Sequence, residues 1–447
     1  MMKRTILLGL IFCLIISSCV KNGTNLDDLN SQLIDAIESN AYIKNLESLI
    51  LPQSDDYQGI PQDPKNPITI EKIKLGQLLF HETALGRNAK MDEGMGSYSC
   101  ASCHHSAAGF QAGVAQGIGD GGLGFGLKGE GRITNSNYNL QDVDVQPLRS
   151  PTVLNTAYQE ITLWNGQFGA TGMNTGTESE WKEDTPIATN EMGYQGVETQ
   201  AIAGLKVHRM TVDESFVHEN PEYRSMFDAA FSEFPTDQKY SNETAGLAIA
   251  AYERTILANQ SPFQNWLNNR SNTLTSGELR GAILFFEKGE CAECHNGPAL
   301  NSMSFHALGM DDLKSNKGMV HGLDEGVKRG RGGFTKMEKD YYKFKTPQLY
   351  SIQESPFYGH GSSFESIEAV IRYKNKAQKE NNGIADRYLS NSFRPLGLND
   401  EEVADLTQFI KTGLYDNNLK RFLPQGVLSG HCFPNNDKIS QRELGCG

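Results

Sequence analysis

The stretch "SCASCHHS", residues 99–106, decides which kind of fold this sequence encodes. Cys100 and Cys103 are separated by two residues and followed at once by His104, and a second copy of the pattern, "CAECHNG", occupies residues 291–297. A close cysteine pair with a histidine is compatible with a zinc site, a redox-active dithiol or a covalently bound haem. These three possibilities imply different proteins, so the rest of the sequence has to discriminate between them.

The spacing of the two copies favours haem. Zinc ribbons place their cysteine pairs about 15–20 residues apart, far closer than here, and a thioredoxin-like dithiol sits beside a strand-helix unit that this sequence lacks. A c-type haem uses every residue of the motif, because both thiols add to the vinyl groups and the following histidine binds the iron. We therefore predict two covalent haems, with His105 as a bystander. The predicted attachment and iron-binding residues are Cys100, Cys103, His104, Cys291, Cys294 and His295.

Composition and charge describe a globular protein. The chain has 447 residues, enough for two or three domains, with 38% hydrophobic and 21% charged residues. Its net charge of −13 argues against a nucleic-acid partner. The same charge would suit a basic protein partner, although an acidic surface more often serves only solubility.

The N-terminus has the pattern of an export signal. Lys3 and Arg4 precede an apolar run, residues 6–16, that is too short to span a bilayer. The run ends in "ISSC", which resembles a bacterial lipobox, so we expect lipidation of Cys19 and a membrane-anchored protein on the periplasmic side, at the outer membrane of a Gram-negative envelope. An ordinary cleaved signal is the alternative. An oxidising compartment would also permit a disulfide between Cys432 and Cys446.

Hydrophobic periodicity predicts a mostly α protein with long glycine-rich loops. Helical spacing occurs in residues 26–37, 69–82, 199–208, 221–231, 243–257, 276–287, 364–373 and 400–412. Residues 105–163 are glycine-rich and weakly periodic, which is typical of loops. "GQLLFHE" before the first cysteine pair and "GAILFFEKGE" before the second form an approximate repeat. The predicted segments are a signal (1–19), a linker and helix (20–59), an N-terminal haem domain (60–270), a C-terminal haem domain (271–430) and a tail (431–447).

With these motifs in place, the sequence resembles the bacterial di-haem cytochrome c peroxidases and MauG, from about residue 60 to about residue 414. The resemblance rests on a series of pieces in order, which are "LGQLLF", "RSPTVLN", "LWNG", "PIATNEMG", "AAYERTILANQSPF", "CAECHNG", "FKTPQLYSI" and "PFYGHGSSF". It implies two cytochrome c-like helical domains with the haems near their interface. It also implies that the C-terminal haem takes electrons from a small redox protein, a c-type cytochrome or cupredoxin, and passes them to an N-terminal haem that reduces hydrogen peroxide.

The resemblance also implies roles for single residues. Trp164 matches the tryptophan between the haems, and Glu191 the distal-pocket glutamate, with Glu198 as a competing placement. Asp120 stands where many of these peroxidases have a removable distal histidine, so we expect an open or water-filled sixth position on the first haem. Tyr373 matches the sixth ligand of the second haem, which is methionine in most of the peroxidases and tyrosine in MauG. A methionine ligand remains the alternative, with Met303, Met310, Met319 and Met337 as candidates.

Further implications of the resemblance are less direct. His360 matches a histidine near the second haem. A calcium ion between the haems would lie near Ser150, Glu354 and Pro356, and a homodimer is compatible with the family. The sequence predicts a peroxidase, and two alternatives stay open: a MauG-like oxidase that modifies a protein substrate, and a plain electron-transfer cytochrome.

Overall fold

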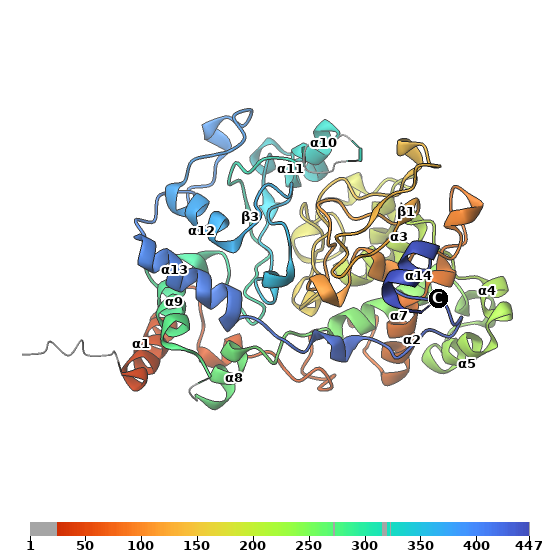
Figure 1. Ribbon diagram of the computed structural model, residues 1–447, viewed down its shortest axis with the longest axis horizontal. Helices are drawn as coiled ribbons and strands as arrows, with labels where there is room; N and C mark the ends of the chain where they lie inside the picture. Colours follow the sequence, from red (N-terminus) through yellow and green to blue (C-terminus); the bar gives the residue numbers. More distant parts are fainter. Residues whose placement is uncertain (1–24, 271–272, 315–319, 322, 447) are drawn as a thin grey trace, which may run out of the picture.

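The computed structural model describes residues 25–270, 273–314, 320–321 and 323–446 (Figure 1). The chain is mostly helical, and its helices are α1 (Leu26–Glu38), α2 (Ile70–His81), α3 (Gly196–Val207), α4 (Glu214–Glu219), α5 (Pro221–Ala230), α6 (Thr236–Lys239), α7 (Asn242–Thr255), α8 (Pro262–Asn269), α9 (Ser276–Phe286), α10 (Glu325–Lys328), α11 (Arg331–Thr335), α12 (Ile367–Lys376), α13 (Asp400–Gln408) and α14 (Lys438–Leu444). Two short antiparallel pairs join β1 (Gly122–Leu123) to β2 (Ile133–Thr134) and β3 (Phe305–His306) to β4 (Phe344–Lys345). The predicted fold class, mostly α with long loops, is confirmed.

The first of two large cores is built by α2, α3, α5 and α7. Helix α7 is buried along most of its length because small residues, chiefly alanine, let neighbouring helices approach it. A Cβ added to Gly76 of α2 would lie 1.9 Å from the Ala248 carbonyl oxygen of α7, so only glycine permits this crossing. The last turn of α2 then leads to the first cysteine pair.

The second core is built by α1, α8, α9, α12 and α13. Helix α9 begins with a capping box between Thr275 and Glu278, and it packs against α13 through Gly281. A Cβ on Gly281 would lie 2.0 Å from the Asp405 carbonyl oxygen. Gly76 and Gly281 occupy the same place in the two copies of the sequence repeat, so the repeat encodes one kind of helix crossing twice.

Packing does not follow chain order. Helix α1 lies far before the second cysteine pair in the sequence, yet it packs with α8 in the second core. Leu419 and Phe422, which follow the second unit, pack in the first core, and α14 contacts β1. Figure 1 shows the C-terminal segment running from the second helical group back to the first. The sequence-based domain limits stay a prediction. The second core includes α1 from the N-terminal part of the chain, and the first core includes Leu419 and Phe422 from the C-terminal part.

The C-terminal tail is fixed on the first cysteine motif. The hydroxyls of Ser99 and Ser102 both donate to the Pro434 carbonyl oxygen, at 2.9 and 3.1 Å. Cys432 and Cys446 form a disulfide that closes the end of this tail. Within the described ranges, no helix combines the length and apolar composition that a membrane-spanning segment needs. The export signal, with Cys19, lies outside the described residues.

Candidate haem sites

The two cysteine motifs adopt the same local structure. Each begins a 3₁₀ turn, Cys100–Ser102 in one and Cys291–Glu293 in the other. The backbone N–H of His104 donates to the Cys100 carbonyl at 3.1 Å, and that of His295 donates to Cys291 at 2.9 Å. This turn brings both thiols and the imidazole of each motif to one side of the chain, as covalent attachment of a haem requires.

The thiols are unpaired and protonated. All four cysteines are free of disulfides, and burial raises the pKa of Cys103 and of Cys291 to about 12. A zinc site would instead need thiolates that converge with other ligands. No group of three or more His, Cys, Asp or Glu side chains that could hold a metal ion occurs in the described part of the chain. Neutral, buried thiols beside a histidine suit thioether bonds to a haem.

Both histidines are neutral and able to bind iron. Burial lowers the pKa of His104 and of His295 to about 4, so each imidazole keeps a free lone pair at neutral pH. The Nδ1–H of His295 donates to the Leu300 carbonyl oxygen at 3.0 Å, which leaves Nε2 as the unprotonated nitrogen. His104 differs, because its Nδ1 is fully buried without a hydrogen-bond partner in the described part of the chain. The donor sets of both motifs therefore fit a c-type haem.

The first motif opens onto a small cavity of about 50 Å³. Its wall includes His208, whose Nδ1 lies 2.8 Å from Asp144 Oδ2, and Glu253 of α7. Burial lowers the pKa of His208, but the Asp144 carboxylate outweighs burial and the net shift is upward. Burial raises the pKa of Glu253 to about 8, and its carboxyl has no hydrogen bond to the described part of the chain. The lining of this cavity thus includes two acids, Asp144 and Glu253, together with His208, the partner of Asp144.

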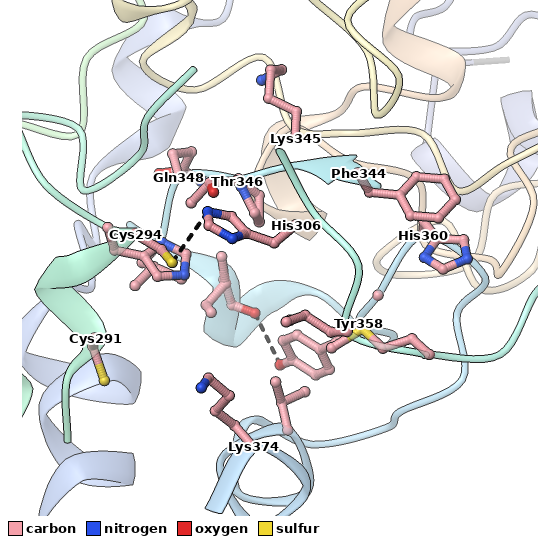
Figure 2. A pocket seen from close by; sticks show the side chains of 18 of the residues that line it. Cys291, Cys294, His306, Phe344, Lys345, Thr346, Gln348, Tyr358, His360 and Lys374 are labelled. Atoms are coloured by element: carbon pink, nitrogen blue, oxygen red, sulfur yellow. Dashed lines mark hydrogen bonds between the residues drawn. The ribbon is translucent and has the colours of Figure 1, made fainter. Parts of the chain in front are cut away.

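The second motif opens onto a larger cavity of about 290 Å³ (Figure 2). Figure 2 shows His306 beside Cys294, with Sγ and Nε2 3.3 Å apart, and Lys374 on the opposite wall. Lys345 is 6% exposed, donates only to the Gln159 side-chain oxygen at 2.5 Å, and burial lowers its pKa to about 7. The described residues pair this buried lysine with no carboxylate, so the cavity has a wall that favours an anionic group.

Trp164 connects the two units. Its indole Nε1–H donates to the Arg149 carbonyl oxygen at 2.8 Å, and its own carbonyl accepts from the Lys345 N–H at 2.7 Å. Its ring centroid lies 6.4 Å from that of His360, which stacks on Phe344 at 3.7 Å. Trp164 and His360 both line the second cavity. The role of Trp164 between the haems stays a prediction, and its position on the second cavity's wall agrees with it.

The predicted distal residues of the first haem lie outside the cavity lining. Asp120 is fully buried and accepts hydrogen bonds from the Tyr138 hydroxyl at 2.6 Å, the Arg209 guanidinium at 2.5 Å and the Lys90 N–H at 2.8 Å. Its oxygens are therefore engaged, although its neighbour Gly119 lines the cavity. Glu191 is exposed at the end of a 3₁₀ segment, Pro186–Met192. Its catalytic role stays a prediction.

Glu198, the competing placement for the distal glutamate, is fully buried in an ion pair with Arg254 at 2.6 Å. That pairing satisfies its charge and makes it a structural residue here. Glu253 was not singled out by the sequence reasoning. The available signal was a single acid near the end of the alanine-rich helix "AGLAIAAYER", where a charge on a fully buried helix needs a reason.

Tyr373 also lies outside the cavity lining. Its hydroxyl donates to the Leu308 carbonyl oxygen at 2.6 Å, and its ring packs between Phe364 and Phe393. Of the methionine alternatives, Met310 lines the cavity and Met337 is exposed. Met303 is half-buried outside the lining, and Met319 lies outside the described residues. Coordination by Tyr373 stays a prediction, and it requires the hydroxyl to leave Leu308.

The predicted calcium site has one suggestive feature. The Ser150 hydroxyl is buried without a hydrogen-bond partner among the described residues. Glu354 is engaged by the Tyr415 hydroxyl at 2.7 Å and by Lys128. Calcium binding stays a prediction.

Comparison with known proteins finds similarity to one family. Residues 70–272 match the family model described as di-haem cytochrome c peroxidase. The chain is 27% identical over 359 residues to methylamine utilization protein MauG of Methylorubrum extorquens, covering 79% of this chain and 81% of that protein. It is 28% identical over 375 residues to cytochrome-c peroxidase IdrP1 of Denitromonas iodatirespirans, covering 79% and 84%. The chain is therefore similar to the di-haem cytochrome c peroxidases and MauG.

A solved structure supports the fold of this chain. A MauG-like protein associated with microbial copper homeostasis superposes with a TM-score of 0.57 at 24% identity, covering 83% of this chain and 95% of that one. The similarity to this family supports an oxidoreductase with c-type haem as its cofactor. The family includes both peroxidases and MauG, so the reaction itself has to be argued from the site.

Proposed function

We propose that this chain is a di-haem peroxidase of the periplasm. Cys100, Cys103 and His104 would hold the first haem. Cys291, Cys294 and His295 would hold the second. The observation that carries the proposal is the pairing of two such turns, each with free thiols and a neutral imidazole on a cavity, with Trp164 placed between Arg149 and Lys345 on the wall of the second.

The bound haems supply the redox chemistry, in which hydrogen peroxide takes two electrons and two protons and leaves as two waters. The protein's part is to position groups and protons. The Asp144 carboxylate holds a proton on His208 at the wall of the first cavity, and burial keeps the Glu253 carboxyl protonated at neutral pH. Either group could deliver a proton where peroxide is reduced, alongside the predicted base Glu191.

The surroundings of the two cavities support electron entry at the second one. The buried side chains of Arg149 and Lys345 and the half-buried Lys374 line the second cavity and favour added negative charge. The first cavity is lined by Asp144 and Glu253 instead. Since Met310 rather than Tyr373 lines the second cavity, the geometry favours a relay haem and hence a peroxidase over a MauG-like oxidase.

The test is steady-state peroxide reduction by the purified holoprotein with a reduced c-type cytochrome or cupredoxin. Trp164→Phe should lower donor-driven turnover at least about tenfold while both haems remain attached. Trp181→Phe is the matched control, because Trp181 is a second tryptophan whose Nε1–H is hydrogen-bonded, to Thr177 at 3.2 Å. Equal turnover by Trp164→Phe and wild type would exclude Trp164 from the route.

A wild type that does not turn peroxide over with a reduced donor, but is oxidised by one equivalent of peroxide and stays oxidised for minutes, would favour the MauG-like alternative over the peroxidase. Six-coordinate, unreactive haems would instead leave a plain electron-transfer cytochrome.

A further inference from the structure

The charge of the chain reverses locally beside the second cavity. Residues 328–343 contain six basic and two acidic side chains, whereas the whole chain has a net charge of −13. The segment comprises the end of α10, all of α11 and the approach to β4. Figure 1 places α10 and α11 at one edge of the molecule, above β3.

The cations of this segment are available to a partner. Arg329, Lys336 and Lys339 are exposed and Lys343 is half-buried. In the described part of the chain none of these four forms an ion pair within 4 Å, whereas Lys328 is paired with Glu325 at 2.8 Å. Four unneutralised cations on one short segment of an acidic protein produce a positive local field.

Three tyrosines accompany these cations. The rings of Tyr341, Tyr342 and Tyr388 contact one another, with centroids 5.2–6.1 Å apart. Arg329 lies over the Tyr341 ring at 5.0 Å and Arg387 over the Tyr388 ring at 4.5 Å. We call Arg329, Lys336, Lys339, Lys343, Arg387 and the three tyrosines the basic rim.

The basic rim is rigid and continuous with the second cavity. The Tyr342 N–H donates to the Arg329 carbonyl at 2.9 Å and the Arg331 N–H donates to the Lys343 carbonyl at 2.8 Å, which ties α10 and α11 to the strand segment. Tyr342 itself lines the second cavity, next to Phe344. The rim therefore reaches from the surface to the wall of the site where electrons are proposed to enter.

From this arrangement we infer that the electron donor is an acidic redox protein that docks on the basic rim. The inference rests on the proposed function in one respect, namely electron entry at the second cavity. Positive charge steers an acidic partner, and tyrosines and arginines are enriched among the residues that contribute most to protein interfaces. The net charge alone would have suggested a basic partner.

A competing edge of the same cavity lacks this character. Arg394 near Glu290 is paired with Glu290 at 2.9 Å and lies 3.7 Å from Glu293. Glu290 lines the cavity, so this second edge is another approach, but its one guanidinium faces two carboxylates and gives it no net positive charge.

The experiment compares donors of opposite charge at low ionic strength, a strongly acidic cupredoxin and a strongly basic cytochrome c. Lys336→Glu/Lys339→Glu should lower kcat/KM for the acidic cupredoxin at least about tenfold and flatten its salt dependence, and should not lower it for the basic cytochrome. Lys44→Glu/Lys420→Glu makes the same charge change at exposed lysines elsewhere and should preserve at least half of the wild-type value. Turnover with a small uncharged reductant should be unchanged in both variants.

An unchanged rate with the acidic cupredoxin in Lys336→Glu/Lys339→Glu overturns the inference. An equal loss in the control double variant, or a larger loss in Arg394→Glu, overturns it as well. Absence of turnover by the wild type with every reductant contradicts the proposed function instead. Calorimetric binding of the oxidised cupredoxin to wild type and to Lys336→Glu/Lys339→Glu then still decides whether the basic rim is the docking surface.

Discussion

The two cysteine motifs share one backbone turn and differ in what surrounds it. The Nδ1–H of His295 donates a hydrogen bond to the Leu300 carbonyl, whereas the Nδ1 of His104 has no hydrogen-bond partner among the described residues. The first cavity is about 50 Å³ and has Asp144 and Glu253 in its lining, and the second is about 290 Å³ and has Arg149, Lys345 and Lys374 in its lining. A motif thus specifies how a cofactor is attached, while the charges of the wall decide what that cofactor is suited to do.

Removing either cysteine pair should have the largest effect on peroxide turnover, and the two removals should differ in which step is lost. Cys100→Ala/Cys103→Ala should abolish peroxide turnover, because the first cavity is where peroxide is proposed to react. Cys291→Ala/Cys294→Ala should abolish donor-driven turnover but leave the first haem, once chemically reduced, able to react once with peroxide. Haem content by the pyridine haemochrome assay should fall by half in both. Donor-driven turnover surviving without the second pair would contradict the assigned order.

The sixth ligand of the second haem gives the next largest effect. If Met310 is the ligand, Met310→Ala should convert the second haem to a high-spin form and lower its reduction potential, with the first haem unchanged. Tyr373→Phe then only removes the hydrogen bond to Leu308 and leaves the spectrum as it was. A spectrum that responds to Tyr373→Phe and ignores Met310→Ala would restore the tyrosine assignment.

The disulfide of the tail should affect the first site alone. Cys432 and Cys446 close a loop with a sequence separation of 14, and loss of such a loop costs about 3 kcal/mol in the chain-entropy account. Cys432→Ser/Cys446→Ser should lower the denaturation midpoint of the first unit and the amide-exchange protection of residues 97–103. Equal losses of protection in α9 and α13 would show that the tail acts on the whole molecule.

A smaller effect should appear in the pH dependence of stability. The Glu253 carboxyl has a pKa of about 8 when folded, above its unfolded value, so between roughly pH 5 and 8 the folded state holds the extra proton. Stability should therefore fall as pH rises through this window, by at most about 1.4 kcal/mol per pH unit from this group. Glu253→Gln should remove that slope, as measured by denaturant unfolding.

Glu243→Gln, at a half-buried glutamate on the same helix, should keep the slope. A slope unchanged by Glu253→Gln would show that another group holds the proton.

Local pattern was enough to predict the helices that carry the repeat. The expected helices at 69–82 and 276–287 are found as α2 (Ile70–His81) and α9 (Ser276–Phe286), since periodic apolar residues and clear caps define them. Helix α14 was not predicted. It is short, and its position depends on tail contacts such as Ser440 with Asp437 and Asp437 with Gly124.

Candidate haem-site residues could be predicted from sequence only where they belong to the Cys-x-x-Cys-His motif itself. Turn geometry around Cys100 and Cys291 follows from adjacent residues, so sequence suffices. Glu253 and Lys345 become notable only when tertiary packing buries them without a partner of opposite charge. No pattern along the chain reports that burial, because the surrounding residues include segments distant in the sequence, such as Asp144 for Glu253 and Gln159 for Lys345.

The hydrogen bond from the Ser99 hydroxyl to the Pro434 carbonyl oxygen spans 335 positions of the chain. The N-terminal haem site is therefore completed only when the C-terminal tail is present. During vectorial synthesis and export, "SCASCH" emerges long before the tail that covers it, and a contact of such high sequence separation forms late. Cys100 and Cys103 would thus remain accessible for haem attachment until the C-terminal tail has been synthesised. The tail would then cover the first motif only after haem attachment, because the tail is synthesised last.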